Sequence, residues 1–238
     1  MRLTEAELDQ FRRDGFLVRP NLFTPTEVAL LRAQLALLFD EETPANIREK
    51  DKREVRTSMG LHLRNPVYAR LVRHPRLFEP AAQIVNDERL YVMRVEVNVK
   101  AAFGGGLWQW HYDFATHHRE DGIPKPLPLN LHVFLDDVSE FNGPLWFIRG
   151  SHRKGPAPTG LDTVTTSYPL WTVPNDAVAS LVEEGGIVSA TGPAGTGLIF
   201  GDTLVHGSPP NMSPWPRRIF SLILNPVVNQ QTRFNRPD

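Results

Sequence analysis

The sequence changes character near Arg89, from helical patterns to short strand patterns separated by Pro- and Gly-rich turns. Upstream, Thr24 and Glu27 form a capping-box pattern with a proline at the first helical position, and apolar residues recur at helical spacing over 28–38. Downstream, seven segments alternate or are short and apolar, which is typical of strands: 90–100, 107–113, 129–136, 144–149, 197–201, 203–206 and 217–228. Helices followed by many short strands predict a mainly β fold with flanking α-helices, such as helices packed on a jelly-roll sandwich.

The length of 238 residues suits one domain. We expect a mainly helical support over 1–88 and a jelly-roll core over 89–238. Residues 41–58 are charged and aperiodic, which predicts a loop. Residues 154–190 lack a clear period, which would suit a lid or an insertion.

Composition excludes several classes of protein. A formal net charge of −1 gives no indication of nucleic acid or an anionic membrane as a partner. Without cysteine, a metal site must use histidine, carboxylates and water. The charged N-terminus is unlike a signal peptide, and no apolar run reaches the roughly 20 residues that span a bilayer. We therefore expect a cytoplasmic protein with a small-molecule partner; the oligomeric state stays open.

The segment 90–100 has one apolar and one polar face. Its polar positions are Arg94, Glu96, Asn98 and Lys100. Such a face is usually solvated, but in a small barrel it can line a polar pocket.

Three residues have the types and spacing of a 2-His-1-carboxylate site for non-haem Fe(II). His111 and Asp113, two apart, share a face if the chain is extended there, and His206 ends an apolar segment. A more ordinary interpretation puts His111 in an aromatic cluster and Asp113 in a turn. His132 is the strongest rival for the third ligand.

Arg217 follows His206 by eleven residues and opens the last predicted strand. A guanidinium matches a carboxylate with two parallel hydrogen bonds, so Arg217 is a candidate to hold 2-oxoglutarate. Adjacent residues of a strand point to opposite faces, so at most one of Arg217 and Arg218 faces a pocket, and both could instead be surface arginines.

These motifs together resemble the phytanoyl-CoA dioxygenase superfamily of Fe(II)/2-oxoglutarate oxygenases, and especially its ectoine-hydroxylase and free amino-acid hydroxylase members. The resemblance covers nearly the whole chain. It rests on Phe11-Arg12-Arg13-Asp14-Gly15-Phe16, Leu135-Asp136-Asp137-Val138, Asn142-Gly143-Pro144-Leu145-Trp146, Gly150-Ser151-His152 and His206-Gly207-Ser208 with Pro216-Arg217-Arg218.

The resemblance implies a double-stranded β-helix with His111, Asp113 and His206 as iron ligands. It also implies that 2-oxoglutarate is held by Arg217, Ser208 and, in ectoine-hydroxylase-like members, Asn98. The co-substrates would be 2-oxoglutarate and O2, with ascorbate as the reductant in vitro. Because halogenating relatives lack the acidic ligand, Asp113 favours hydroxylation, with release of succinate and CO2.

The substrate is less constrained by the sequence. Arg56 lies in a segment that resembles the cover of the substrate pocket in amino-acid hydroxylases, where it would pair with a carboxylate. Further candidate substrate-binding residues are Trp108, Trp110, Phe114, His117 and Trp171. We expect a small carboxylated substrate such as a free amino acid, with an acyl-CoA or a natural-product intermediate as alternatives.

Two hypotheses from other classes remain open at this point. The same ligands could hold Zn²⁺ in a metallohydrolase, which would give Arg217 no role. The chain could also be a non-catalytic jelly-roll binding module.

Overall fold

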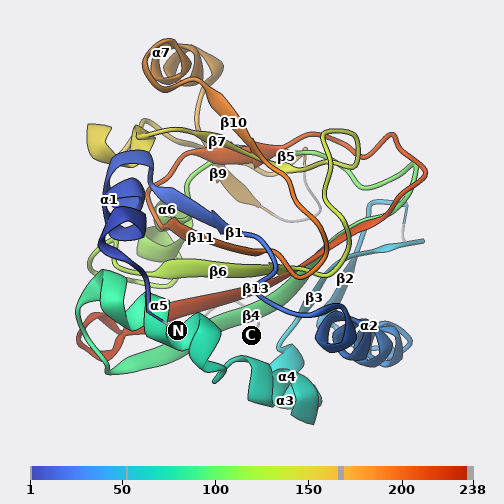
Figure 1. Ribbon diagram of the computed structural model, residues 1–238. Coiled ribbons are helices and arrows are strands. Elements are labelled where there is room, and N and C mark those ends of the chain that lie inside the picture. Colours follow the sequence, from blue (N-terminus) through green and yellow to red (C-terminus); the bar gives the residue numbers. More distant parts are fainter. Residues whose placement is uncertain (1, 52, 166–168, 235–238) are drawn as a thin grey trace.

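The computed structural model describes residues 2–51, 53–165 and 169–234, and it contains two antiparallel β-sheets packed face to face with helices outside (Figure 1). This arrangement confirms the predicted mainly β sandwich with flanking helices. In the described part of the chain, no helix is both long and apolar enough to cross a membrane.

The larger sheet contains strands β1 (Phe16–Arg19), β2 (Asn46–Arg48), β3 (Val55–Met59), β4 (Leu90–Lys100), β6 (Leu129–Phe134), β11 (Gly197–Gly201) and β13 (Arg217–Pro226). The smaller sheet contains β5 (Trp108–His111), β7 (Leu145–Ile148), β8 (Gly160–Asp162), β9 (Leu170–Thr172), β10 (Ile187–Ala190) and β12 (His206–Ser208). The strand orders are β1-β11-β6-β13-β4-β3-β2 and β10-β7-β12-β5-β9-β8.

The α-helices are α1 (Glu5–Asp14), α2 (Pro25–Phe39), α3 (Leu61–Arg64), α4 (Pro66–Leu71), α5 (Pro75–Val85), α6 (Asp113–Arg119) and α7 (Asn175–Gly185). Short 3-10 turns lie at Ser151–Lys154 and Val227–Asn229. The predicted capping box is present, because the Thr24 side chain accepts from the backbone N–H of Glu27 while the Glu27 carboxylate accepts from that of Thr24.

Helices of the first ninety residues cover the outer face of the larger sheet (Figure 1). Tyr68 of α4 stacks on Phe220 of β13 with ring centroids 5.7 Å apart, and its hydroxyl donates to Leu31 O. Alternate residues of β4, such as Val95 and Val97, are buried in the same cluster. The apolar face of β4 therefore packs outward against the helices, and its polar face turns toward the second sheet.

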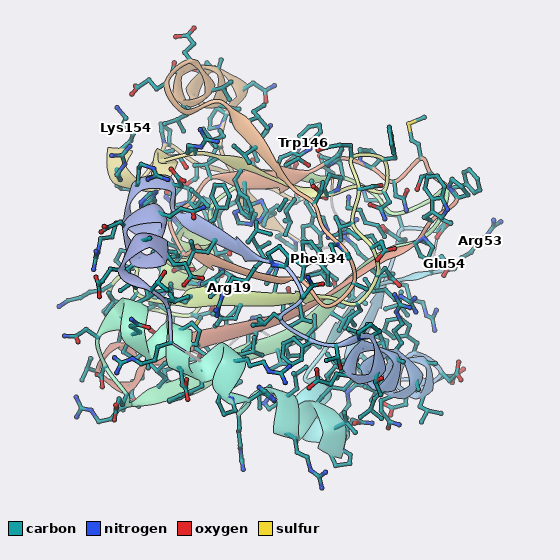
Figure 2. The ribbon with its side chains drawn as sticks, in the orientation of Figure 1. Arg19, Arg53, Glu54, Phe134, Trp146 and Lys154 are labelled. Carbon is teal, nitrogen blue, oxygen red and sulfur yellow. The ribbon has the colours of Figure 1, made fainter. Side chains whose placement is uncertain are left out.

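Aromatic rings fill one part of the space between the sheets. Phe16 stacks on Phe147 with ring centroids 4.8 Å apart, and the ring centroids of Phe147 and Phe200 are 5.1 Å apart. Phe134 belongs to the same buried cluster and lies near the centre of the molecule (Figure 2). These rings close one side of the sandwich and leave a polar cavity elsewhere between the sheets.

The segment 41–58 differs from its prediction as a loop. It contains β2 and β3, and β3 pairs with β4 in register Thr57 to Asn98. The sequence shows no alternation there because polar side chains of β3 are buried with partners: Ser58 Oγ donates to Asn46 Oδ1 and Thr57 Oγ1 to Asn98 Oδ1. The larger sheet thus includes strands from both sides of residue 88, which we had expected to separate the helical support from the jelly-roll core.

Two downstream predictions also differ in detail. The strand expected at 203–206 is β12, which begins at His206. The expected lid, 154–190, contains β8, β9, α7 and β10, and of its residues 166–168 lie outside those described. Its residues Leu161, Leu170 and Trp171 line the central cavity, so the segment forms a wall there; its movement as a lid stays a prediction.

Candidate active site

The three predicted metal ligands come together at the inner face of the smaller sheet. His111 ends β5, Asp113 begins α6, and His206 begins β12, which pairs with β5 in register His206 to His111. Their potential ligand atoms all lie within 4.8 Å of one another. Asp113 Oδ1 is 3.7 Å from His111 Nε2 and 4.0 Å from His206 Nε2.

Hydrogen bonds on the far side of each ligand orient these atoms inward. His111 Nδ1 lies 2.6 Å from Gln109 O and His206 Nδ1 lies 2.9 Å from Leu204 O, so each Nδ1–H donates to a backbone carbonyl. This leaves the Nε2 lone pair of each ring for a metal ion. Asn130 of β6 donates to Asp113 Oδ2 at 2.8 Å, which leaves Oδ1 facing the two imidazoles.

The electrostatics favour the ligating protonation states. Burial, followed by repulsion from His206, lowers the pKa of His111 to about 4. Burial raises the pKa of Asp113, but the neighbouring His206, His111 and His117, with the Asn130 hydrogen bond, outweigh it and bring the pKa to about 2. At neutral pH the site therefore presents a neutral His111 and an ionised Asp113. Two imidazoles and one carboxylate on one side of a cavity fit a divalent iron with open positions.

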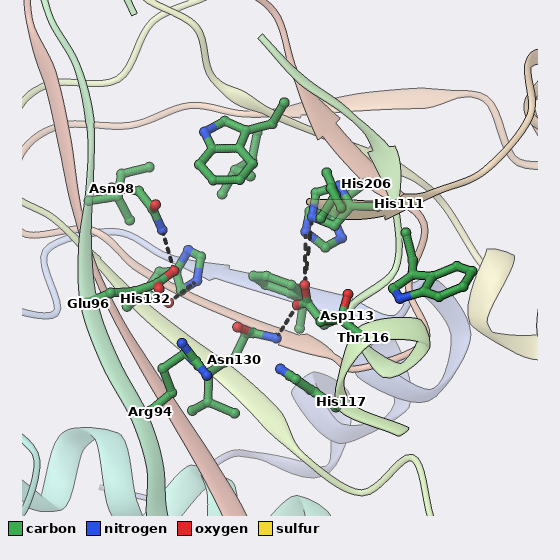
Figure 3. A pocket seen from close by; sticks show the side chains of 18 of the residues that line it. Arg94, Glu96, Asn98, His111, Asp113, Thr116, His117, Asn130, His132 and His206 are labelled. Atoms are coloured by element: carbon green, nitrogen blue, oxygen red, sulfur yellow. Dashed lines mark hydrogen bonds and ion pairs between the residues drawn. The ribbon is translucent and has the colours of Figure 1, made fainter. Parts of the chain in front are cut away.

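A cavity of about 350 Å³ lies between the sheets and contains this cluster. Figure 3 shows His111, Asp113 and His206 on one side of the cavity and Glu96 and Asn98 of β4 on the other. Alternate residues of the β4 polar face thus line the pocket, as the second interpretation of this face predicted.

Arg217 lies in the same cavity at the start of β13 and is 1% exposed. Burial, with repulsion from Arg56, lowers its pKa to about 9, so it remains charged at neutral pH. Within the described residues, its Nε has no hydrogen-bond partner. A buried, charged guanidinium without a partner is costly unless an anion binds it, and 2-oxoglutarate supplies a carboxylate of matching geometry.

The other two predicted 2-oxoglutarate residues differ in placement. Asn98 lines the cavity, but its Nδ2 donates to Glu96 Oε1 and its Oδ1 accepts from Thr57. Ser208 is buried outside the cavity, and its hydroxyl donates to Gly143 O. A register shift between His206 and Ser208 in β12 turns the two side chains differently, which a simple two-residue period does not predict.

Arg56 is also turned away from the cavity. It is 2% exposed, pairs with Glu49 at 3.0 Å, donates to Leu107 O and lies over the Trp108 ring at 4.1 Å. The structure therefore does not support Arg56 as a partner for a substrate carboxylate. Trp108 itself does line the cavity.

Of the remaining substrate candidates, two reach the cavity and two do not. His117 lines it, with Nδ1 held 2.7 Å from the buried Asp202 Oδ1. Trp171 lines it as well, and its indole N–H donates to Glu120 Oε1. Trp110 and Phe114 pack instead in a separate apolar cluster beside α6.

His132, the rival third ligand, lines the cavity from β6 but lies outside the metal-binding group. Its Nε2 is 2.8 Å from Ser221 Oγ. Burial lowers its pKa to about 3, so it is neutral at neutral pH.

Sequence reasoning did not identify several polar residues of the cavity, among them Arg94, Glu96 and Asn130. Arg94 and Glu96 were identified only as members of a polar face, and Asn130 stands among apolar residues of β6. An Asn between two leucines of a buried strand was a signal, because a buried amide requires hydrogen-bond partners.

The family model described as phytanoyl-CoA dioxygenase (PhyH) matches residues 11–219. The chain is 36% identical over 239 residues to an ectoine dioxygenase of Bordetella bronchiseptica, covering 95% of this chain and 77% of the relative. It is 34% identical over 238 residues to an L-proline trans-4-hydroxylase of Streptomyces griseoviridis, covering 96% and 88%.

Among solved structures, EctD from S. alaskensis with bound Fe superposes with a TM-score of 0.86 at 33% identity, covering 99% of this chain and 82% of that one. The same enzyme with 2-oxoglutarate and 5-hydroxyectoine gives a TM-score of 0.85 at 31% identity, with the same coverage. These matches confirm the jelly-roll fold. They leave the metallohydrolase and the binding-module hypotheses without support.

Proposed function

The chain belongs to the phytanoyl-CoA dioxygenase family and is a non-haem iron dioxygenase that uses 2-oxoglutarate and O2, and from this premise we propose that it hydroxylates a C–H bond of a small free amino acid. The observation that carries the proposal is that one cavity holds both the His111–Asp113–His206 cluster and Arg217, whose Nε has no hydrogen-bond partner among the described residues.

Each residue of the site has a defined role in this proposal. His111, Asp113 and His206 hold the iron through Nε2, Oδ1 and Nε2. Arg217 binds the distal carboxylate of 2-oxoglutarate and so orients its keto acid end toward the metal. Together, bound Fe(II), 2-oxoglutarate and O2 supply the oxidising chemistry that yields succinate, CO2 and a hydroxylated carbon.

Apolar walls complete the site. Trp108, Leu161, Leu170 and Trp171 line the cavity around the polar cluster. They restrict the approach of water and hold one substrate C–H bond toward the metal. The protein thereby chooses which carbon is hydroxylated.

A small substrate is supported by the cavity size and by the relatives. About 350 Å³ must accommodate 2-oxoglutarate and the substrate together. The relatives named above are enzymes of ectoine and of L-proline, which are both small and carboxylated. An acyl-CoA or a natural-product intermediate remains the alternative with the same chemistry.

The test is turnover of a defined mixture of free amino acids and ectoine with Fe(II), ascorbate and 2-oxoglutarate. We expect mass spectrometry to show one component gaining an oxygen atom with an equal amount of succinate. Asp113→Ala should abolish both products, whereas Asp176→Ala, a substitution on the exposed surface of α7, should leave them unchanged.

Succinate without any oxygenated component would retain the oxygenase and reject free amino acids and ectoine as substrates. No succinate together with no binding of 2-oxoglutarate would reject the proposed function itself.

A further inference from the structure

Lys100 is the last residue of β4 and of its polar face. It is 0% exposed and lies directly opposite Arg217 of β13, the neighbouring strand (Figure 1). Residues opposite each other on antiparallel strands point to the same face, with Cα atoms about 4.5–5.5 Å apart. A lysine is therefore buried beside the arginine to which the distal carboxylate of 2-oxoglutarate is assigned.

Backbone carbonyl groups surround the Lys100 ammonium. Nζ donates to Gly106 O at 2.7 Å and to Pro209 O at 2.5 Å, and Ser208 O lies 3.4 Å away. Three N–H groups and three acceptors match a protonated lysine, whereas a neutral amine has only two N–H groups. Within the described residues, Nζ has no carboxylate at ion-pair distance. The charge is thus stabilised by carbonyl dipoles rather than by an acidic partner.

These carbonyl groups belong to two connections of the site. Gly106 lies in the connection from β4 to β5. Ser208 ends β12, and Pro209 opens the connection from β12 to Arg217 at the start of β13. Since β5 and β12 contain the two histidine ligands, one ammonium links the chain segments beside the metal cluster to the end of the cavity that contains the arginine.

Two glycines make room for the Lys100 side chain. A Cβ atom on Gly105 would lie 2.7 Å from Lys100 Cα, and one on Gly143 would lie 2.5 Å from Lys100 Cδ and 2.9 Å from Pro209 O. Both glycines have positive φ, 65° and 78°, which side chains rarely adopt. The backbone therefore encloses the stem closely and restricts Nζ to the space between the two connections.

Charged groups of β13, of β3 and of the segment after β2 act on Lys100. Burial, followed by repulsion from Arg217 and Arg56, lowers the pKa of Lys100 to about 6, and Glu49 opposes this shift. Glu49 also pairs with Arg56 and accepts from the backbone N–H of Gly106. A carboxylate bound to Arg217 would offset part of the repulsion and so favour the proton on Lys100.

We propose that Lys100 is a positioning residue for 2-oxoglutarate: its ammonium fastens the two connections beside Arg217, and the proton on Nζ and the co-substrate on Arg217 stabilise each other. This assignment rests on the role of Arg217 in the proposed function. Lys100 acts through Arg217 and the backbone around it. When Nζ loses its proton, one of the three carbonyl groups loses its donor and the repulsion ends, so binding of 2-oxoglutarate is coupled to uptake of a proton.

The wild-type protein provides the first test. Binding of 2-oxoglutarate is measured by titration calorimetry at saturating Mn(II), between about pH 6 and about pH 8, in pairs of buffers that differ in ionisation enthalpy. We expect uptake of roughly half a proton or more per 2-oxoglutarate at about pH 7, and an affinity at least about threefold weaker at about pH 8 than at about pH 6. Arg217 remains protonated over this range because its pKa is about 9.

Lys100→Met assigns the effect, because it retains a long unbranched stem and removes the ammonium. We expect its Kd for 2-oxoglutarate to be at least about tenfold above the wild-type value at about pH 6 and independent of pH, without proton uptake. Mn(II) affinity should stay within about threefold of wild type, because other hydrogen bonds orient the metal ligands. Lys125→Met, the same change at an exposed lysine, is the matched control and should bind as wild type does.

Wild-type binding without proton uptake and with constant affinity over this pH range would overturn the proposal, whether or not Lys100→Met folds. A folded Lys100→Met protein that binds as wild type does, or that still takes up the proton, would overturn it as well. Equal losses of Mn(II) and 2-oxoglutarate affinity would show a general structural role and also reject it. If the wild type binds no 2-oxoglutarate at all, the proposed function itself fails.

Discussion

At the scale of single residues, the amide of Asn130 determines which oxygen of Asp113 faces the two histidines. Its hydrogen bond engages Oδ2 and leaves Oδ1 at 3.7 Å and 4.0 Å from the imidazole nitrogens. Partners of this kind commonly change metal affinity by about 10–100-fold when removed. The geometry of the metal site thus depends on a residue that does not contact the metal.

Asn130→Leu should therefore weaken Mn(II) binding about 10–100-fold. Leucine has a similar volume but no donor, so the Asp113 carboxylate loses its fixed orientation. Titration calorimetry of the metal-free protein measures the change, and Asn175→Leu at the exposed start of α7 is the control. An unchanged dissociation constant would show that Asn130 does not orient the ligand.

Arg217→Lys should raise the KM for 2-oxoglutarate about tenfold or more while Mn(II) affinity stays constant. Lysine retains the charge but loses the two-pronged match to a carboxylate. The neighbouring Arg218→Lys is a stringent control, because Arg218 points the other way and pairs with Asp136 at 2.7 Å and 2.8 Å. Equal effects of both substitutions on KM would contradict the assignment.

His132 should make the metal-free protein less stable in mild acid. Burial lowers its pKa to about 3, whereas an unfolded histidine titrates near 6.5. Between these values the unfolded chain binds a proton that the folded chain excludes, so this stabilisation is complete above about pH 6.5 and is lost as the pH falls toward 3.

Urea unfolding at about pH 6 and about pH 5 tests the effect of His132. In His132→Gln the free energy of unfolding should depend less steeply on pH, by up to about 1.4 kcal/mol per unit. An identical slope in both proteins would show that His132 does not titrate as described.

His111 and Asp113 were predictable because residue type and a two-residue spacing carry the information locally, whereas His206 was assigned through the family resemblance. Arg94 and Glu96 were predictable as a polar face but not as part of a site, because the opposite sheet decides whether such a face is solvated. The orientation of Ser208 was not predictable, since it follows from a register shift in β12.

At the scale of elements, the two short strands at one end of the larger sheet depend on distant partners. β2 and β3 extend the larger sheet, yet their buried polar residues are satisfied by Asn98 and by each other. No local pattern encodes such pairing, so the sequence could not distinguish this hairpin from a loop. The helices were easier to predict from the sequence, because caps and apolar spacing are local signals.

The capping box of α2 gives a stability prediction at this scale. Thr24→Ala removes the hydroxyl that accepts from Glu27 N–H and should lower the free energy of unfolding by about 1 kcal/mol. Urea denaturation measures the loss, with Ser180→Ala on the exposed face of α7 as the control. Turnover should be unaffected, because α2 packs on the sheet face opposite the cavity.

At the scale of the whole molecule, the two sheets contribute different groups of residues to the cavity. The larger sheet contributes Arg94, Glu96, Asn98 and Arg217 to the cavity, and the smaller sheet with α6 contributes the metal ligands. Helices bury the outer face of the larger sheet. The two halves of the site meet only when both sheets are folded and packed, which is why spacing in the sequence could identify each half but not their arrangement.

Turnover under isotopically labelled O2 tests the central claim most directly. The account predicts that a single labelled oxygen atom enters the hydroxylated amino acid and another enters succinate, in equal amounts, and that Asp113→Ala abolishes both. A product whose new oxygen comes from water, or an oxygenated product formed without succinate, would contradict the assignment of this chain as a 2-oxoglutarate-dependent hydroxylase.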